Sequence, residues 1–266
     1  PWGISIPDDP AHTKYVWFDA LVNYISAIGW PASAEATAGK PSNFEKWWPV
    51  VQFAGKDNLR QQAAMWQAML MSVGLPPSKQ IVIHGFIMNA GRKMSKSVGN
   101  AIDPFKLVEE YGTDAVRYYL LRHIHPFEDS DFTIEKFKEA YNAHLANGLG
   151  NLVSRVLTMS KSLSRRVLAT GKDSPLPREL TNFLGHYEFN HALDFIWQKI
   201  EMCDQFIQET KPFALIKNDP TQAKADIEHL VGELWQIADW LKPFIPATAE
   251  KIKTLIAENH RPETPL

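Results

Sequence analysis

Two short apolar runs separated by one helical segment constrain the fold of this chain more than any other feature. The first run covers residues 50–54 and ends at Gly55, and the second covers residues 80–84. A helical pattern fills residues 58–73 between them and is followed by glycine and a pair of prolines. A strand, a helix and a second strand with such short connections form a βαβ unit. We therefore predict a parallel sheet covered by helices here.

The residues before this unit predict one more strand and one more helix. Residues 14–18 are rich in types that favour strands, and Asp19 follows them as a possible N-cap for a helix over residues 20–28. Residues 33–41 are rich in Ala, Ser, Thr and Gly, which is typical of a loop.

The pattern changes after the second apolar run. Residues 89–91 predict a hairpin turn, and a polar stretch follows over residues 92–100. Two helices are predicted next, over residues 104–111, with Asp103 as the N-cap, and over residues 114–122.

Strand patterns end near residue 132, and helical apolar spacing continues almost to the last residue. The predicted helices cover residues 134–147, 149–169, 188–210, 221–241 and 246–258. Consecutive helices of this kind form a bundle. We therefore predict an α/β fold followed by an all-α fold, with residues 1–131 in the first domain and residues 132–266 in the second.

Composition limits what such a chain can do. Hydrophobic residues make up 45% and charged residues 22% of the 266, which excludes general disorder. No apolar run approaches the roughly 20 residues of a membrane span, so no membrane partner is expected. The single cysteine, Cys203, excludes an internal disulfide and is predicted to be a packing residue in a reducing compartment.

The formal net charge is −2, so any nucleic-acid contact requires a local basic patch. Such a patch lies between Ala140 and Lys172, where no residue is acidic. Asn151 and Arg155, four residues apart, share one face of a predicted helix there. A solvated charged face is the alternative interpretation. The cationic residues of this patch are Arg155, Lys161, Arg165, Arg166 and Lys172.

The sequence Arg-Lys-Met-Ser-Lys-Ser at residues 92–97 gives the strongest indication of chemistry. Lys93 and Lys96 lie among small hydroxyl residues, with glycines on both sides of the segment. An arbitrary pair of lysines at this spacing is usually just a solvated loop. Here the segment follows a strand at the carboxyl edge of the predicted sheet, where ligands of open α/β sheets bind. The position favours cations that meet a phosphate chain.

Residues 93–97 resemble the second signature motif of the class I aminoacyl-tRNA synthetases. The chain most closely resembles the methionyl-tRNA synthetases among them, over essentially its whole length. The resemblance is strong as far as Asp131 and weaker in the helical part. It implies the C-terminal part of a Rossmann-type catalytic domain followed by a helical anticodon-binding domain. The segments that carry it are YVWFDALVNY at 15–24, GKD at 55–57, HGF at 84–86, SVGN at 97–100 and VEEYGTDAVRYY at 108–119.

The resemblance implies a reaction in two steps. Methionine and ATP form methionyl-adenylate and pyrophosphate, and tRNA(Met) then accepts the methionyl group. It implies ATP with Mg²⁺ as the cofactor, Lys93 and Lys96 as catalytic cations that bind the triphosphate, and Asp57 and His84 as further ATP-binding residues. Helix capping by Asp57 and a structural hydrogen bond of His84 are the alternatives.

The same resemblance implies a methionine pocket. Polarizable sulfur beside aromatic rings is favourable by about 0.3–1.5 kcal/mol, although aromatic residues at helical spacing usually belong to a core. Many relatives have an aliphatic residue and a histidine where this chain has Asn58 and Gln62, but Gln62 can still donate a hydrogen bond. The implied pocket residues are Trp17, Ala20, Tyr24, Asn58, Gln62 and Trp66.

In the helical part, the resemblance implies that Asn151 and Arg155 read the methionine anticodon. It places Phe213 where many relatives have a tryptophan. A phenylalanine still offers a face on which an unpaired base stacks, although it lacks the indole donor.

Two features of the family are missing from the sequence, the tetrapeptide His-x-Gly-His and the cysteines of a zinc-binding insertion. We therefore expect no zinc ligands in this chain. We also expect a cytoplasmic synthetase of which the N-terminal half of the catalytic domain is missing here, so that the isolated fragment is inactive. Another class I synthetase and a non-catalytic tRNA-binding module are the alternatives, and the intact Lys93 and Lys96 count against the second.

Overall fold

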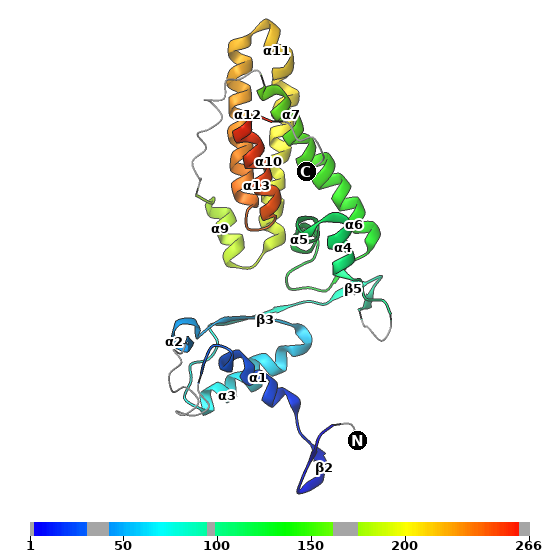
Figure 1. The fold of residues 1–266 in the computed structure, drawn as a ribbon, viewed down its shortest axis with the longest axis vertical. Coiled ribbons are helices and arrows are strands. Elements are labelled where there is room, and N and C mark those ends of the chain that lie inside the picture. Colours follow the sequence, from blue (N-terminus) through cyan, green and yellow to red (C-terminus); the bar gives the residue numbers. More distant parts are fainter. Residues whose placement is uncertain (1–2, 31–42, 95–98, 162–174, 261–266) are drawn as a thin grey trace. The chain divides into compact units, whose positions relative to one another are not determined.

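A computed structural model describes residues 3–30, 43–94, 99–161 and 175–260 (Figure 1). The chain divides into two compact units, Pro1–Phe86 and Ile87–Leu266. The predicted loop over residues 33–41 lies outside the described residues. The predicted boundary near Asp131 concerns the domains of the family, which compactness does not test, and it stays a prediction.

The first unit begins with a hairpin and a helix rather than the predicted strand. Strand β1 (Ser5–Ile6) pairs in antiparallel fashion with β2 (Asp9–Thr13), and helix α1 (Val16–Ser26) follows. The strand predicted over residues 14–18 is therefore wrong. Its residues favour strands locally, but a helix buries Leu21 and Ile25 together on the core, and tertiary packing overrides such local preferences. Asp19 lies in the first helical turn instead of capping it.

The predicted βαβ unit is confirmed. Strands β3 (Val51–Gly55) and β4 (Gln80–His84) pair in parallel, with Gly55 beside His84 at their carboxyl ends. The connection between them is helical throughout most of its length, and short helix α2 (Phe44–Trp47) precedes the unit. The connection between β3 and β4 consists of the 3₁₀ turn η2 (Lys56–Asn58), the π-helical turn η3 (Gln61–Met65) and helix α3 (Trp66–Ser72).

Apolar side chains from α1, α3 and the segment before β3 form the core of the first unit. Leu21, Ile25, Trp48, Trp66 and Leu70 are all buried in one cluster. The rings of Trp48 and Trp66 meet edge to face, with centroids 6.1 Å apart. This geometry is favourable for aromatic pairs beyond the area that they bury. It fixes α3 against the rest of the unit.

The second unit begins with a three-stranded sheet of order β6-β5-β7. Strands β5 (Ile87–Asn89) and β6 (Arg92–Lys93) form an antiparallel hairpin, and β7 (Ser130–Asp131) pairs in parallel with β5. The hairpin turn was predicted from the sequence and is confirmed. Its two residues, Ala90 and Gly91, have φ values of 51° and 71°, as the tight hairpin turns require.

Two helices follow the hairpin. Helix α4 (Pro104–Tyr111) has the predicted N-cap, because Asp103 Oδ1 accepts a hydrogen bond from the Phe105 amide at 2.9 Å. Helix α5 (Thr113–Arg122) comes next. Arg117 donates two hydrogen bonds, to the carbonyl oxygens of Pro243 and Phe244 at 2.8 and 2.7 Å. These bonds attach α5 to the helical bundle.

The bundle is built from long helices with one apolar face each. Its first path runs without a break through α6 (Ile134–Ala140), the π-helical segment η4 (Tyr141–Gly150) and α7 (Asn151–Ser160). The helices predicted over residues 134–147 and 149–169 thus form one continuous path as far as residue 160, and residues 162–169 lie outside the described residues. Gly150 keeps helical angles, φ −61° and ψ −41°, because glycine inside a helix costs only about 1 kcal/mol and packing outweighs it.

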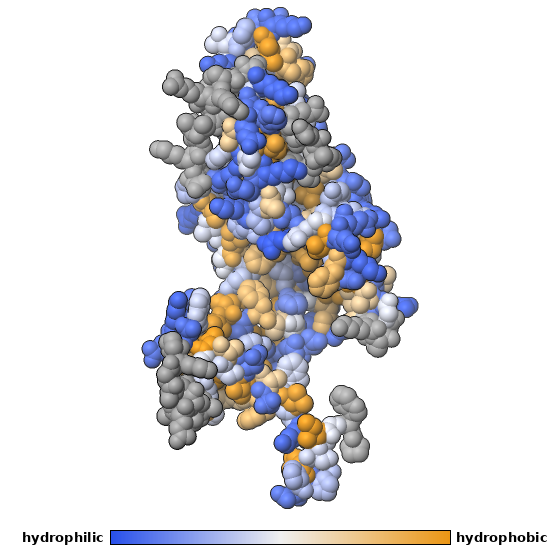
Figure 2. Space-filling model, in the orientation of Figure 1, coloured by the Kyte–Doolittle hydropathy of each residue, from blue (hydrophilic) through white to orange (hydrophobic). Residues whose placement is uncertain are grey.

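The remaining helices pack around this path. A continuous core of buried residues includes Leu152, Val156, Ile196, Leu234 and Ile252. Hydrophilic side chains cover much of the visible face of the bundle (Figure 2). The predicted helical bundle is therefore confirmed for the described residues. Its further helices are α9 (Arg178–Gly185), α10 (Phe189–Thr210), α11 (Pro212–Asn218), α12 (Pro220–Leu241) and α13 (Pro246–Glu258).

Candidate functional site

The carboxyl ends of β3 and β4 bring two of the proposed ATP-binding residues together. A Cβ atom added to Gly55 would lie 3.0 Å from Oδ1 of Asp57 and 3.7 Å from Cε1 of His84. Both side chains therefore gather over Gly55, whose missing side chain leaves room between them. Asp57 lies inside the 3₁₀ turn η2, whose own N-cap position is Gly55, and its alternative role as a helix N-cap stays a prediction.

His84 has one ring nitrogen fixed by its own backbone neighbour. Its Nδ1 lies 2.8 Å from the carbonyl oxygen of Gly85. A carbonyl oxygen only accepts hydrogen bonds, so Nδ1 carries the proton, and Nε2 of the neutral ring is an acceptor. Both the structural hydrogen bond and a ligand contact through Nε2 are therefore compatible with this geometry.

Three of the six proposed methionine-pocket residues meet in the first unit. Gln62 Nε2 donates a hydrogen bond to the Tyr24 hydroxyl oxygen at 2.9 Å, and the centroids of the Tyr24 and Trp66 rings lie 6.0 Å apart. Trp17 and Ala20 lie on the same face of α1 as Tyr24, since the three are spaced at i, i+3 and i+7.

Asn58 is the exception. It is half-buried in η2, and within the described residues no hydrogen bond joins it to the other pocket residues.

Two buried polar atoms of this cluster are unsatisfied. Gln62 is only 2% exposed and Trp66 only 1% exposed. Neither Oε1 of Gln62 nor Nε1 of Trp66 has a hydrogen-bond partner among the described residues. Such groups are uncommon in folded proteins because each costs about 1–3 kcal/mol when left unpaired.

An apolar cavity of about 220 Å³ has Trp66 in its lining. Its lining also includes Phe18 and Val22 of α1 and Met69 of α3. Trp66 is the only proposed methionine residue that contributes to it. The cavity is therefore not the pocket that the sequence predicts.

The hairpin of the second unit carries Lys93 at the end of β6. The side-chain amide of Asn100 donates to the carbonyl oxygen of Lys93 at 3.2 Å, and Asn89 Nδ2 donates to the carbonyl oxygen of Asn100 at 2.9 Å. These two bonds join the start and the end of the segment 93–100. Lys96 lies outside the described residues.

Asn151 and Arg155 lie on α7 beside its buried stripe, as the spacing predicts. Asn151 is exposed and Arg155 half-buried, whereas Leu152 and Val156 are buried. Arg155 is held by a residue that the sequence analysis missed, because its Nη1 lies 2.6 Å from Oδ1 of Asp204 on α10. Burial raises the pKa of the Asp204 carboxyl, and the Arg155 guanidinium opposes this rise. A single carboxylate in a long helix gives no sequence signal for such a pair.

Phe213 lies just beyond the turn between α10 and α11. Lys211 has φ +48° at this turn, Pro212 is buried, and the side chain of Phe213 is 56% exposed. Phe213 thus presents an aromatic face to solvent. Helix α11, which carries it, lies at one end of the bundle (Figure 1). Arg165, Arg166 and Lys172 of the basic patch lie outside the described residues.

Three further observations concern metal ligands, membrane spans and the cysteine in the part of the chain that the structure describes. There, no three His, Cys, Asp or Glu side chains gather closely enough to hold a metal ion, and no helix is both long and apolar enough to cross a bilayer. Cys203 is buried in the bundle core, which confirms its predicted packing role, and burial raises the pKa of its thiol to about 11.

Comparison with known proteins supports the resemblance on which the site residues rest. A methionine–tRNA ligase of Lactococcus lactis is 40% identical over 265 residues, covering 94% of this chain and 39% of the relative. One of Rhizobium meliloti is 36% identical, covering 96% and 51%. The chain thus spans about half or less of the length of the curated relatives that it matches.

Solved structures agree with these relatives. Mycobacterium tuberculosis methionyl-tRNA synthetase in complex with methionyl-adenylate is similar with a TM-score of 0.75 and 31% identity, covering 96% of this chain and 52% of that one. Residues 1–157, more than half of this chain, match the family model for class I tRNA synthetases of the M type. With its fold and its motifs in agreement, the chain belongs to the methionyl-tRNA synthetase family of class I tRNA synthetases.

Proposed function

We propose that this chain carries part of the machinery that joins methionine to tRNA(Met) at the expense of ATP. In this proposal, residues 1–131 are the C-terminal part of a Rossmann-type catalytic domain, and residues 132–266 are the anticodon-binding domain. The observation that carries the proposal is the edge of the parallel pair β3–β4, where Asp57 and His84 gather over Gly55. Ligands of open α/β sheets bind at such edges.

The ATP-binding residues of the proposal are Asp57, His84, Lys93 and Lys96. The carboxylate of Asp57 suits the ribose hydroxyls, and Nε2 of His84 suits a donor group of the nucleotide. Lys93 and Lys96 suit the triphosphate, whose negative charge two ammonium groups can match. Mg²⁺ would accompany the triphosphate, because it prefers phosphate oxygens and water to dedicated protein cages.

In the first step a carboxylate oxygen of methionine attacks the α-phosphorus of ATP. A new oxygen–phosphorus bond forms, the bond to the bridging oxygen breaks, and pyrophosphate leaves with the electron pair. The attacking carboxylate is ionised at neutral pH, so the step needs no general base. The contribution of the protein is positioning and the stabilisation of developing negative charge by Lys93 and Lys96.

Methionine is proposed to bind beside Trp17, Ala20, Tyr24, Gln62 and Trp66, with Asn58 at the margin. The unsatisfied Oε1 of Gln62 and Nε1 of Trp66 support this proposal, because a ligand with a donor and an acceptor would satisfy both atoms. The hydrogen bond between Gln62 and Tyr24 fixes the amide, so that Oε1 has a defined direction.

The tRNA is proposed to meet Asn151, Arg155 and Phe213. The contact between Arg155 and Asp204 uses one nitrogen of a guanidinium that has five N–H donors, so Arg155 can still donate to a base. Asp204 would hold the guanidinium in the direction of the anticodon. Phe213, with its exposed ring, would stack on an unpaired base. A cytoplasmic location goes with this role in translation and is part of the proposal.

Methionine-dependent exchange of pyrophosphate into ATP, measured on the protein in its full natural length, tests the first half of the proposal. We expect exchange with methionine and charging of tRNA with a CAU anticodon. Exchange with leucine, valine, isoleucine or cysteine instead would support another class I synthetase. tRNA binding without exchange for any amino acid would support a non-catalytic tRNA-binding module.

A further inference from the structure

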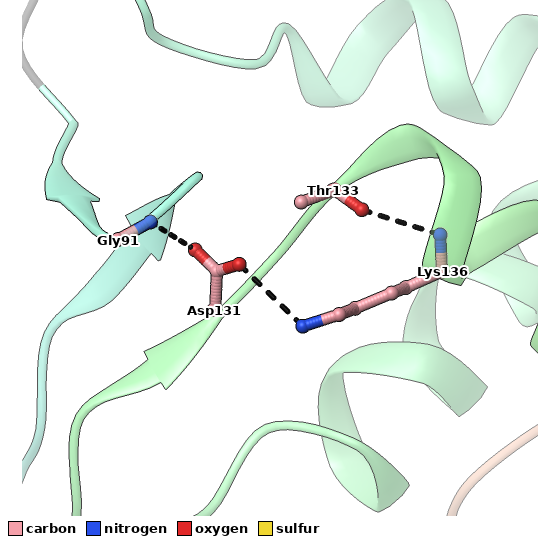
Figure 3. Close-up of polar contacts among 4 residues, drawn as sticks. All are labelled: Gly91, Asp131, Thr133 and Lys136. Carbon is pink, nitrogen blue, oxygen red and sulfur yellow. Dashed lines mark hydrogen bonds and ion pairs between the residues drawn. The ribbon is translucent and has the colours of Figure 1, made fainter.

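One carboxylate holds the turn of the hairpin that carries Lys93. The backbone amide of Gly91 donates a hydrogen bond to Oδ1 of Asp131 at 2.9 Å (Figure 3). The second oxygen, Oδ2, lies 3.5 Å from Nζ of Lys136. Forty residues separate Gly91 from Asp131 in the chain, so this contact joins two distant segments.

The backbone on both sides of Asp131 is fixed. Met88 and Asp131 are partners in the parallel pairing of β5 with β7, and the Phe132 amide donates to the carbonyl oxygen of Met88 at 2.8 Å. Thr133 then caps α6, since its hydroxyl oxygen accepts from the Lys136 amide at 3.3 Å (Figure 3). The side chain of Asp131 therefore leaves a rigid corner of the backbone and needs little ordering to reach Gly91.

The turn that it holds is a demanding one. Ala90 and Gly91 both have positive φ values, a conformation that Ala adopts at a cost. An external acceptor for the Gly91 amide favours this turn over alternatives that point the amide elsewhere. Lys93 follows two residues later on β6, so the direction of the turn sets where β6 and its lysine lie.

We propose that Asp131 is a positioning residue for Lys93: its Oδ1 fixes the hairpin turn through the Gly91 amide, and thereby places the Lys93 ammonium for the triphosphate. This inference rests on the proposed function of Lys93. Asp131 touches no reacting atom in the proposal. Lys136 balances its charge, so the carboxylate acts on the turn rather than as a free anion near the substrate.

Pyrophosphate exchange by full-length variants tests this inference. Asp131→Ala removes the acceptor and should lower kcat about tenfold, which is the effect of one charge-assisted hydrogen bond. Asp131→Asn keeps an acceptor oxygen for Gly91 and should retain most of kcat. The KM for methionine should stay the same in both. Glu135→Ala, which removes an exposed carboxylate of the neighbouring helix α6, is the matched control.

Active-site titration gives kcat per competent enzyme, so that a loss of folded protein is separated from a loss of positioning. A double-mutant cycle then asks whether Asp131 acts through Lys93. If it does, Asp131→Ala should cost little further activity once Lys93→Ala is present. Losses that multiply, an unchanged kcat in Asp131→Ala, or an equal loss in Asp131→Asn would each overturn the inference. If Lys93→Ala itself leaves exchange unchanged, the proposed role of Lys93 fails as well.

Discussion

The two units place their candidate site residues differently with respect to the core. In the first unit, Gln62 and Trp66 belong to the proposed methionine pocket and are also buried among the residues that hold the unit together. In the second unit, Asn151 and Phe213 lie at the surface, and the core packs without them. Function and stability should therefore be coupled in the pocket and separable on the bundle. This difference can be tested by substitution.

The largest effect is expected for Trp66→Ala. Removing a fully buried tryptophan leaves a cavity and should lower the free energy of unfolding by about 3–5 kcal/mol. The midpoint and slope of urea unfolding measure this loss. Trp66→Phe keeps a ring against Trp48 and is the matched control, with a smaller loss expected. If Trp66→Ala keeps its stability and only binds methionine less well, function and stability are not coupled in the pocket. Trp66 would then contribute to methionine binding and not to the core.

Unlike Trp66→Ala, Lys96→Ala should lower the catalytic rate and leave the stability of the protein nearly unchanged. Removing a cation used mainly in the transition state should cost on the order of 3 kcal/mol, which is a hundredfold or more in the rate of pyrophosphate exchange. Methionine binding and the urea midpoint should change little. Lys106→Ala, on α4, provides a control for the loss of a lysine elsewhere. Unchanged turnover in Lys96→Ala would remove the lysine from the proposed mechanism.

Arg155→Ala tests the surface site on the bundle. Losing the hydrogen bonds of a charged donor should reduce discrimination in favour of a CAU anticodon by about 1.5–3 kcal/mol, while adenylate formation stays nearly intact. Charging of tRNA with the CAU anticodon and with a mutated anticodon measures the ratio. Asp204→Asn, which removes the charge that holds Arg155, should reduce the ratio less. Equal charging of both tRNAs by the unsubstituted enzyme would contradict the proposed role outright.

The parts of the molecule that local sequence specifies were the ones that could be predicted. Strand β4 and the N-cap at Asp103 depend on neighbouring residues, and both were confirmed. The parallel pairing of β3 with β4 followed from the βαβ unit, which needs only the order of its elements.

What depended on distant contacts could not be predicted. Helix α1 begins at Val16 because Leu21 and Ile25 reach a core whose other half comes from residues 48–70, and no window around Val16 contains that information. The partners of Gly91 and Arg155 are likewise single carboxylates, Asp131 and Asp204, 40 and 49 residues away. Motifs identify reactive residues, whereas the residues that orient them emerge only from the fold.

The smallest effect is expected from a change of pH, which should alter the free energy of unfolding through His123 of the second unit. The ring of His123 stacks on that of His144, with centroids 5.3 Å apart and planes at 7°, and lies 5.0 Å from the ring of Tyr119. Burial, with the nearby charge of Arg122 as a further cause, lowers the pKa of His123 from 6.5 to about 4, and Asp194 opposes this only in part. Burial also lowers the pKa of His144.

Between pH 6.5 and about 4, the unfolded chain therefore binds a proton at His123 that the folded chain does not, and the contribution of His123 to the free energy of unfolding falls as the pH falls through this range. With a discount for partial exposure to solvent, we expect a loss of about 1 kcal/mol between pH 7 and pH 5, read from urea midpoints. His123→Phe keeps an aromatic ring in the stack but cannot take up a proton, so its stability should fall less over the same range. An equal fall in both proteins would mean that groups other than the His123 ring set the acid sensitivity of the fold.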